Sequence, residues 1–129
     1  MPKTRKLSDG EWKIMTLLWE ESPRTLTELT RALSEDTGWT KHTVISMLDR
    51  MEAKGAVRYE TGERARRYYP AIERESTALA ETESFLRRVY SGSLGLMVNA
   101  MARSGGLSEA ELKELRDILK EAEENKDDS

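Results

Sequence analysis

The sequence predicts a mainly helical protein that carries one small β-hairpin, and three observations predict this fold class. Apolar residues recur at helical spacing in six separate segments. Three of these segments open with a capping box, a Ser or Thr followed three residues later by Glu, which marks the start of a helix. Between the third and fourth segments, apolar and polar residues alternate before a glycine turn, as they do in a hairpin.

Two helices are expected in the first 38 residues. Ser8 is the predicted N-cap of a helix of about a dozen residues. Pro23 ends it, because proline lacks an N–H group and disfavours helical geometry in the residue before it. Thr25 opens a second helix that is expected to run to about Leu33. Gly38 marks the end of this helix or the turn beyond it.

A third helix and the hairpin follow in one continuous stretch. Thr40 is the expected N-cap of the helix, and Gly55 supplies its left-handed C-terminal cap. A strand over residues 57–60, a turn at Gly62 and a returning strand over residues 67–69 form the hairpin. Three helices and a hairpin in this order make a winged helix-turn-helix. The buried face of the third helix is expected to consist of Val44, Met47, Leu48 and Met51.

Three more helices are expected in the remainder, over residues 73–90 and 94–101 and from Ser108 to a polar tail at residues 125–129. Their apolar stripes are too narrow to bury a separate core within one chain. We therefore expect these helices to pair with a second copy of the chain in a homodimer. The residues expected at this dimer interface are Phe85, Leu86, Val89, Leu94, Met97, Leu112, Leu115 and Leu119.

Charge divides the chain into the same two parts. Residues 1–72, the expected winged-helix domain, carry 13 Lys and Arg against 11 Asp and Glu. Residues 73–129, the expected helical dimerisation region, carry 8 against 13. The net charge of −3 therefore does not argue against nucleic-acid binding, because the basic groups are concentrated near the third helix and the hairpin.

Composition excludes several other classes of protein. The chain has no cysteine and one histidine, so disulfides, thiolate metal sites and cysteine catalysis are excluded, and we expect no metal and no other cofactor. No arrangement of residues indicates a catalytic site, so we expect no enzymatic activity. No apolar run approaches the ~20 residues of a membrane span, and none fits a signal peptide. We expect a cytoplasmic protein.

The exposed face of the third helix and the hairpin form the candidate DNA-binding surface. The helix N-terminus offers free amides and a favourable dipole to phosphate. Basic and hydroxyl side chains can bind phosphates or base edges, and guanidinium groups suit the negative potential of the minor groove. The expected DNA-binding residues are Thr40, Lys41, His42, Thr43, Ser46, Arg50, Arg64, Arg66 and Arg67.

The residues alone leave two alternatives open. An exposed helix face is polar in any protein surrounded by water, and an arginine-rich turn can be a solubilising loop. A winged helix can also act as a protein-protein interaction module, because a partner strand can pair with the edge of its hairpin. Three arginines within four positions favour double-stranded DNA over both alternatives.

Several short motifs follow one another along nearly the whole chain. They are LSDGEW at residues 7–12, WTKHTV at 39–44, LDR at 48–50, KG at 54–55, YYP at 68–70, FL at 85–86, YSG at 90–92, LS at 107–108 and ELRDIL at 114–119. Each motif is modest, but their order and spacing together resemble the penicillinase-repressor (BlaI/MecI) family of bacterial winged-helix repressors.

The resemblance implies a homodimer that binds a short palindromic operator and blocks transcription. In relatives that govern β-lactam resistance, a membrane sensor triggers cleavage of the repressor at an Asn-Phe bond, so a sensor protease is an implied partner. Aligned without gaps, that bond falls on Ala100 and Met101 here, with Asn99 one place upstream, and the cleavage signal is not reproduced. A second branch senses copper through C-terminal cysteines, which this chain lacks.

Overall fold

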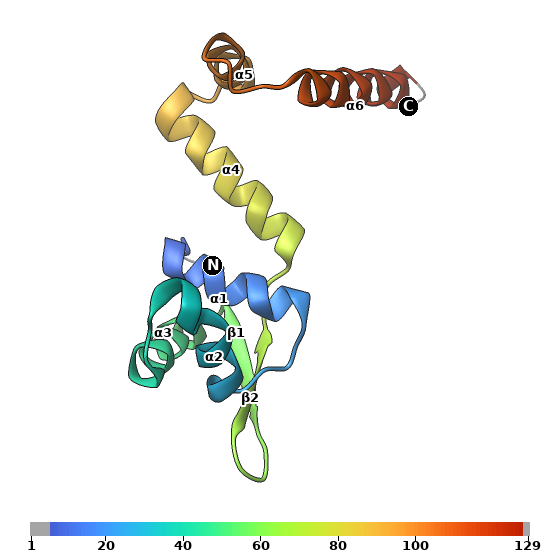
Figure 1. The fold of residues 1–129 in the computed structure, drawn as a ribbon. Helices are drawn as coiled ribbons and strands as arrows, with labels where there is room; N and C mark the ends of the chain where they lie inside the picture. The colour runs from blue at the N-terminus through green and yellow to red at the C-terminus, as the bar shows by residue number, and fades with distance from the viewer. Residues whose placement is uncertain (1–5, 128–129) are drawn as a thin grey trace. The chain divides into compact units, whose positions relative to one another are not determined.

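The structure, a computed structural model, describes residues 6–127 and has six helices and one antiparallel hairpin in that range (Figure 1). The predicted mainly helical class with a small hairpin is confirmed. In chain order the elements are α1 (Asp9–Glu20), α2 (Leu26–Thr37), α3 (Lys41–Ala53), β1 (Val57–Thr61), β2 (Arg66–Pro70), α4 (Arg74–Tyr90), α5 (Leu94–Arg103) and α6 (Glu109–Asp127).

Capping side chains begin the helices where the sequence predicts. Ser8 and Thr25 each accept a hydrogen bond from the backbone of the Glu three residues later, whose carboxylate accepts one in return. Ser108 forms the same box with Glu111 at the start of α6. Thr40 caps α3 by accepting from the backbone N–H of Thr43. The predicted helix starts are therefore confirmed.

Two helices extend beyond their predicted apolar stripes, α2 to the end at Gly38 that the sequence also predicts, and α6 into the predicted tail. Helix α2 continues past Leu33 to Thr37, because the backbone first leaves helical geometry at Gly38, where φ is +71°. Helix α6 continues to Asp127, so residues 125–127 extend the helix instead of forming a tail. The rest of that expected tail, residues 128–129, lies outside the described residues.

One hydrophobic core joins α1, α2, α3 and the hairpin. All four apolar residues predicted for the buried face of α3 belong to it. Tyr68 of β2 is 1% exposed and is the largest fully buried side chain. The core consists of Leu7, Ile14, Met15, Leu18, Leu29, Leu33, Val44, Met47, Leu48, Met51, Ala56, Val57 and Tyr68.

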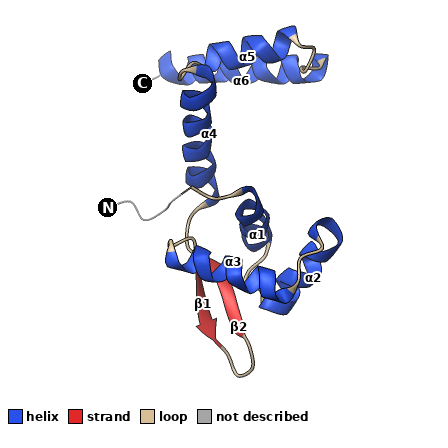
Figure 2. Cartoon of the chain, turned by 90° about the vertical axis from the view of Figure 1, so that its left-hand side faces the viewer, coloured by secondary structure: helices blue, strands red, loops and turns tan. Residues whose placement is uncertain are grey.

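Strands β1 and β2 and their connecting turn, together called the wing, form an antiparallel hairpin (Figure 2). Their register runs from Val57 opposite Pro70 to Thr61 opposite Arg66. Tyr68 also pairs with Arg24, in the segment before α2. Its N–H donates to the Arg24 carbonyl at 2.9 Å and its carbonyl accepts from the Arg24 N–H at 3.2 Å. The wing is therefore attached directly to the helices.

Gly10 allows α1 to lie close to the start of α3. A Cβ atom at this position would lie 2.8 Å from Cε of Met47 and 3.0 Å from Cη2 of Trp39. Trp39 directly precedes the N-cap of α3, and Met47 lies within the helix. A side chain at Gly10 would therefore force the side chains of Met47 and Trp39 to shift.

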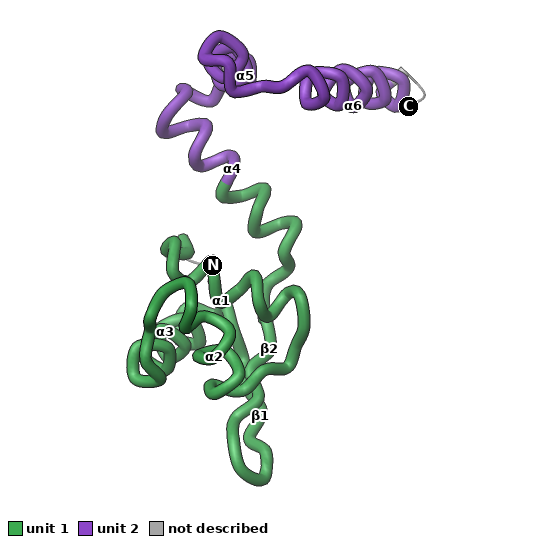
Figure 3. Tube along the Cα trace, in the orientation of Figure 1, with its two compact units in different colours: residues 1–81 green, residues 82–129 purple. Residues whose placement is uncertain are grey.

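The chain divides into two compact units, residues 1–81 and residues 82–129, with the boundary inside α4 (Figure 3). The core lies entirely in the first unit. In α4, α5 and α6, no side chain that the structure describes is buried in the single chain. No described helix is long and apolar enough to cross a membrane. The most exposed apolar side chains of these helices are Leu79, Val89, Leu94, Leu96, Ile118 and Leu119.

Candidate nucleic-acid interface

The outward face of α3 is the row of side chains opposite its buried stripe. His42, Ile45, Ser46 and Asp49 follow one another at steps of three, one and three, so they share one side of the helix. His42 and Asp49 are exposed, and Ile45 and Ser46 are half-buried. Of these four, sequence reasoning selected His42 and Ser46 and missed the other two. The helical spacing itself could have found them.

The remaining predicted residues of α3 lie at its edges. Thr40 and Lys41 are exposed at the start of the helix, and Thr43 is half-buried. The Thr40 hydroxyl lies 3.3 Å from the backbone nitrogen of Thr43 and is used as a cap. Arg50 is exposed one turn after Ser46, close enough for its charge to act on the Glu11 carboxylate of α1. At this position Arg50 is better placed to contact the DNA backbone than to contact base edges.

A buried ion pair fixes the other end of α3. Lys54 follows the last residue of the helix, and its ammonium group donates to Oε1 of Glu11 at 2.8 Å and to the Lys6 carbonyl at 3.1 Å. The Glu11 side chain is 4% exposed and that of Lys54 is 17% exposed. Because Glu11 also closes the capping box of α1, this pair connects the start of α1 to the end of α3. Sequence reasoning missed this contact.

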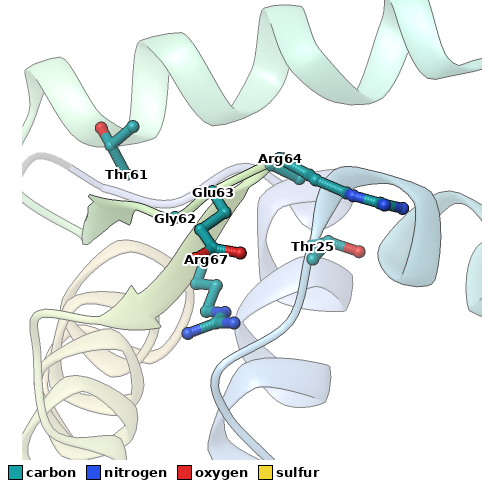
Figure 4. A pocket seen from close by; sticks show the side chains of 7 residues that line it. Thr25, Thr61, Gly62, Glu63, Arg64 and Arg67 are labelled. Atoms are coloured by element: carbon teal, nitrogen blue, oxygen red, sulfur yellow. The ribbon is translucent and has the colours of Figure 1, made fainter.

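Arg64 and Arg67 border an open hollow at the tip of the wing (Figure 4). The hollow has a volume of about 740 Å³, and Thr25, the N-cap of α2, lines it opposite the wing. Figure 4 shows the two arginine side chains extending from the hairpin in different directions. Two guanidinium groups border this hollow beside the N-terminus of α2, and the carboxylates of Glu63 and of Glu28, which closes the capping box with Thr25, offset part of their charge. The hollow therefore suits a phosphate.

Arg66 is placed differently from the other two wing arginines. Its guanidinium lies over the ring of Tyr59, 4.3 Å from the ring centre, and Arg66 is the first residue of β2, opposite Thr61. The pKa of Arg66 is raised, chiefly by its contact with Tyr68 and also by Tyr59 and by the carboxylate of Asp49. Arg66 therefore lines a crevice together with Ile45 of α3, whereas Arg64 and Arg67 border the hollow beside Thr25.

Comparison with known proteins shows the family to which the chain is similar. Residues 7–121 match the family model described as "Penicillinase repressor". The penicillinase repressor of Bacillus licheniformis is 32% identical over 126 residues, which cover 98% of each chain. The methicillin resistance regulatory protein MecI of Staphylococcus aureus (strain N315) is 24% identical over 117 residues, which cover 91% of this chain and 95% of that protein.

Solved structures show the same fold for the N-terminal part. The DNA-binding domain of the repressor BlaI superposes with a TM-score of 0.53 at 32% identity, covering 60% of this chain and 93% of that one. The monomeric form of Bacillus licheniformis BlaI, solved in complex with the blaP half-operator, gives a TM-score of 0.51 at the same identity and coverage.

The fold and the cations on α3 and the wing define a winged helix-turn-helix protein of the kind that binds DNA. More specifically, the chain belongs to the penicillinase repressor family, because the family model and the Bacillus licheniformis relative both match nearly its whole length. This is a family of transcriptional repressors and not of enzymes.

Proposed function

We propose that the protein is a dimeric transcriptional repressor that binds an inverted-repeat operator through α3 and the wing. The observation that carries this proposal is the outward row of α3 beside an arginine-bearing wing, in a chain that matches a known repressor over 98% of its length. The BlaI structure in complex with a half-operator supports double-stranded DNA as the partner. Such a role places the protein in the cytoplasm.

The two parts of the surface have different tasks. The outward row of α3 reads base edges in the major groove, because a helix fits that groove and each base pair presents a distinct pattern of donors and acceptors there. Lys41, Arg50, Arg64 and Arg67 contact phosphates or the minor groove, which positions the domain without selecting a sequence. Thr40 and Thr43 form the N-terminus of α3, which contacts a phosphate of the DNA backbone.

The exposed apolar side chains of the C-terminal helices support dimerisation. Leu119 is 60% exposed, Leu94 is 56% exposed and Val89 is 51% exposed in the single chain. Burying one such side chain completely contributes about 1.5–3 kcal/mol, so a second copy of the chain that covers these helices would gain a stable interface. We accordingly assign residues 1–72 to DNA binding and residues 73–129 to dimerisation. Leu79, Leu96 and Ile118 extend the predicted interface.

Release of the DNA by a sensor protease is the route that the family suggests. Ala100 and Met101, where the cleaved bond of the relatives falls, lie inside α5 with exposed side chains. A protease needs an extended substrate, so this part of α5 would have to unwind before cleavage. Mass spectrometry of the protein recovered from cells under antibiotic challenge identifies cleavage here, and an intact chain in cells that have lost repression would exclude it.

Footprinting on the protein's own upstream DNA tests the proposed function. Two copies of α3 in a dimer contact half-sites about one helical turn, ~34–36 Å, apart, so the full chain should protect an inverted repeat with that spacing. A scrambled duplex of the same composition serves as the control. Uniform protection of both duplexes would show that the protein does not recognise an operator and would favour the protein-protein interaction module instead.

A further inference from the structure

One acidic side chain lies in the row of α3 that is proposed to read DNA. Asp49 follows His42 by seven residues and Ile45 by four, so it completes that row after two helical turns. Its side chain is exposed. The buried stripe of the helix does not use it, and it does not cap either end of α3.

A carboxylate at this position weakens binding to most DNA. Phosphates repel it, and the acceptor atoms of the major groove, N7 and O6 of guanine and O4 of thymine, give it no donor. Only the exocyclic amino groups of the bases can donate a hydrogen bond to this carboxylate, and cytosine N4 is the usual partner of Asp and Glu. Asp49 therefore penalises every sequence that places an acceptor atom, and not an amino group, opposite it.

A fixed cation lies on the same side of α3. Ile45 and Arg66 line one crevice formed by α3, the start of α2 and the wing, with a volume of about 260 Å³. Asp49 lies one turn beyond Ile45, and the guanidinium of Arg66 is held over the ring of Tyr59. Arg66 thus offsets part of the charge of Asp49, which lowers the cost of bringing that carboxylate to DNA.

We propose that Asp49 is a specificity-determining residue that accepts a hydrogen bond from cytosine N4 in each operator half-site. The inference rests on the proposed function and names one base that the recognition helix requires. Ile45, the apolar member of the same row, suits a thymine methyl group. Four helical residues rise about 6 Å, so the cytosine should lie about two base-pair steps of 3.4 Å from that thymine.

Selection of binding sites from a random duplex library tests this proposal. The full chain is compared with Asp49→Asn, which keeps the shape but removes the charge, and with Asp49→Ala. Glu20→Gln is the control, because it removes one exposed negative charge from α1, outside α3 and the wing. Thermal melts followed by circular dichroism confirm that each variant is folded.

The parent and Glu20→Gln should select a half-site with an invariant cytosine, and replacing that base should weaken binding about tenfold. Asp49→Ala should lose the preference at that position alone and bind every base there with similar affinity, whereas Asp49→Asn should shift the preference toward adenine, whose N6 and N7 pair with an amide. Both variants should bind a scrambled duplex more tightly than the parent does. Asp49 variants that select the parental site unchanged would overturn the inference while leaving the proposed function intact. A parent that selects no sequence would refute the proposed function and the inference with it.

Discussion

Replacing Lys54 by Met tests how the end of α3 is held. The substitution keeps most of the apolar stem but removes the ammonium group, which lies 2.8 Å from Oε1 of Glu11. The Glu11 carboxylate then remains buried, with a side chain only 4% exposed, and loses its charged partner. It keeps the N–H of Ser8 as a donor at 2.9 Å. The variant is therefore expected to be less stable without losing its fold.

The expected loss in the free energy of unfolding lies between the values for exposed and buried ion pairs. Removing one partner of a fully buried pair costs about 3–5 kcal/mol, whereas an exposed pair contributes about 0–1 kcal/mol. Lys54 is 17% exposed and Glu11 retains one hydrogen bond, so we expect the free energy of unfolding to fall by about 2 kcal/mol at pH 7. Lys13→Met is the matched control, because Lys13 makes an equally short but exposed pair with Asp36.

The loss should also depend on pH. Burial by itself raises the pKa of Glu11, but hydrogen bonds from Lys54 and Ser8 and the charges of Lys54 and Arg50 outweigh it and hold the pKa below the ordinary value of 4.5. A carboxyl whose pKa is lowered in the folded state stabilises the protein above the pKa of the unfolded chain. This stabilisation disappears as the pH falls through the folded value. The difference between parent and Lys54→Met should therefore shrink below pH 4.5.

Urea unfolding of the full chain, followed by tryptophan fluorescence, measures these differences. All three tryptophans, Trp12, Trp19 and Trp39, lie in the unit that contains the ion pair. Glu11→Gln combined with Lys54→Met should recover part of the loss, because no unpaired charge is then buried. A Lys54→Met variant that loses no more stability than Lys13→Met would refute the view that this pair is buried and fixes α3.

Three further substitutions give distinct results. Arg64→Ala should weaken binding to operator and scrambled duplex alike and lower the slope of log affinity against log salt by about one, measured by fluorescence anisotropy. Gly10→Ala should cost about 1–3 kcal/mol in urea unfolding, because its Cβ would force the side chains of Met47 and Trp39 to shift. Leu119→Asp should shift the protein from dimer to monomer in sedimentation velocity, while Lys120→Asp on another side of α6 should not. An unchanged salt slope, an unchanged stability or an unchanged sedimentation coefficient would contradict the respective prediction.

Helix starts could be predicted from the sequence because a cap is a local interaction. Ser8, Thr25 and Thr40 each bond a backbone N–H three residues away, so a short stretch of sequence contains both partners. Helix ends were harder to predict. The segment of α2 after Leu33 has no apolar residue to indicate burial, yet its backbone hydrogen bonds continue until Gly38. Periodicity therefore located the packed part of α2 and missed the rest.

The candidate site was only partly predictable for a different reason. Sequence reasoning selected residues for positive charge and hydrogen-bonding groups, so Asp49 and Ile45 were left out although they share the row of His42. Arg66 was grouped with its sequence neighbours, but its position depends on Tyr59 across the hairpin. The pairing of Lys54 with Glu11 joins residues 43 positions apart, and no local pattern indicates such a contact.

Fluorescence anisotropy of the full chain on DNA across a range of salt concentrations tests most directly whether this family member recognises an operator through α3 and the wing. A labelled duplex that carries the footprinted repeat is compared with a scrambled duplex. Binding to the repeat should be at least about a thousandfold tighter, and both affinities should fall steeply with salt as counterions are released. Equal affinity for the two duplexes, or an affinity insensitive to salt, would contradict the proposed mode of binding.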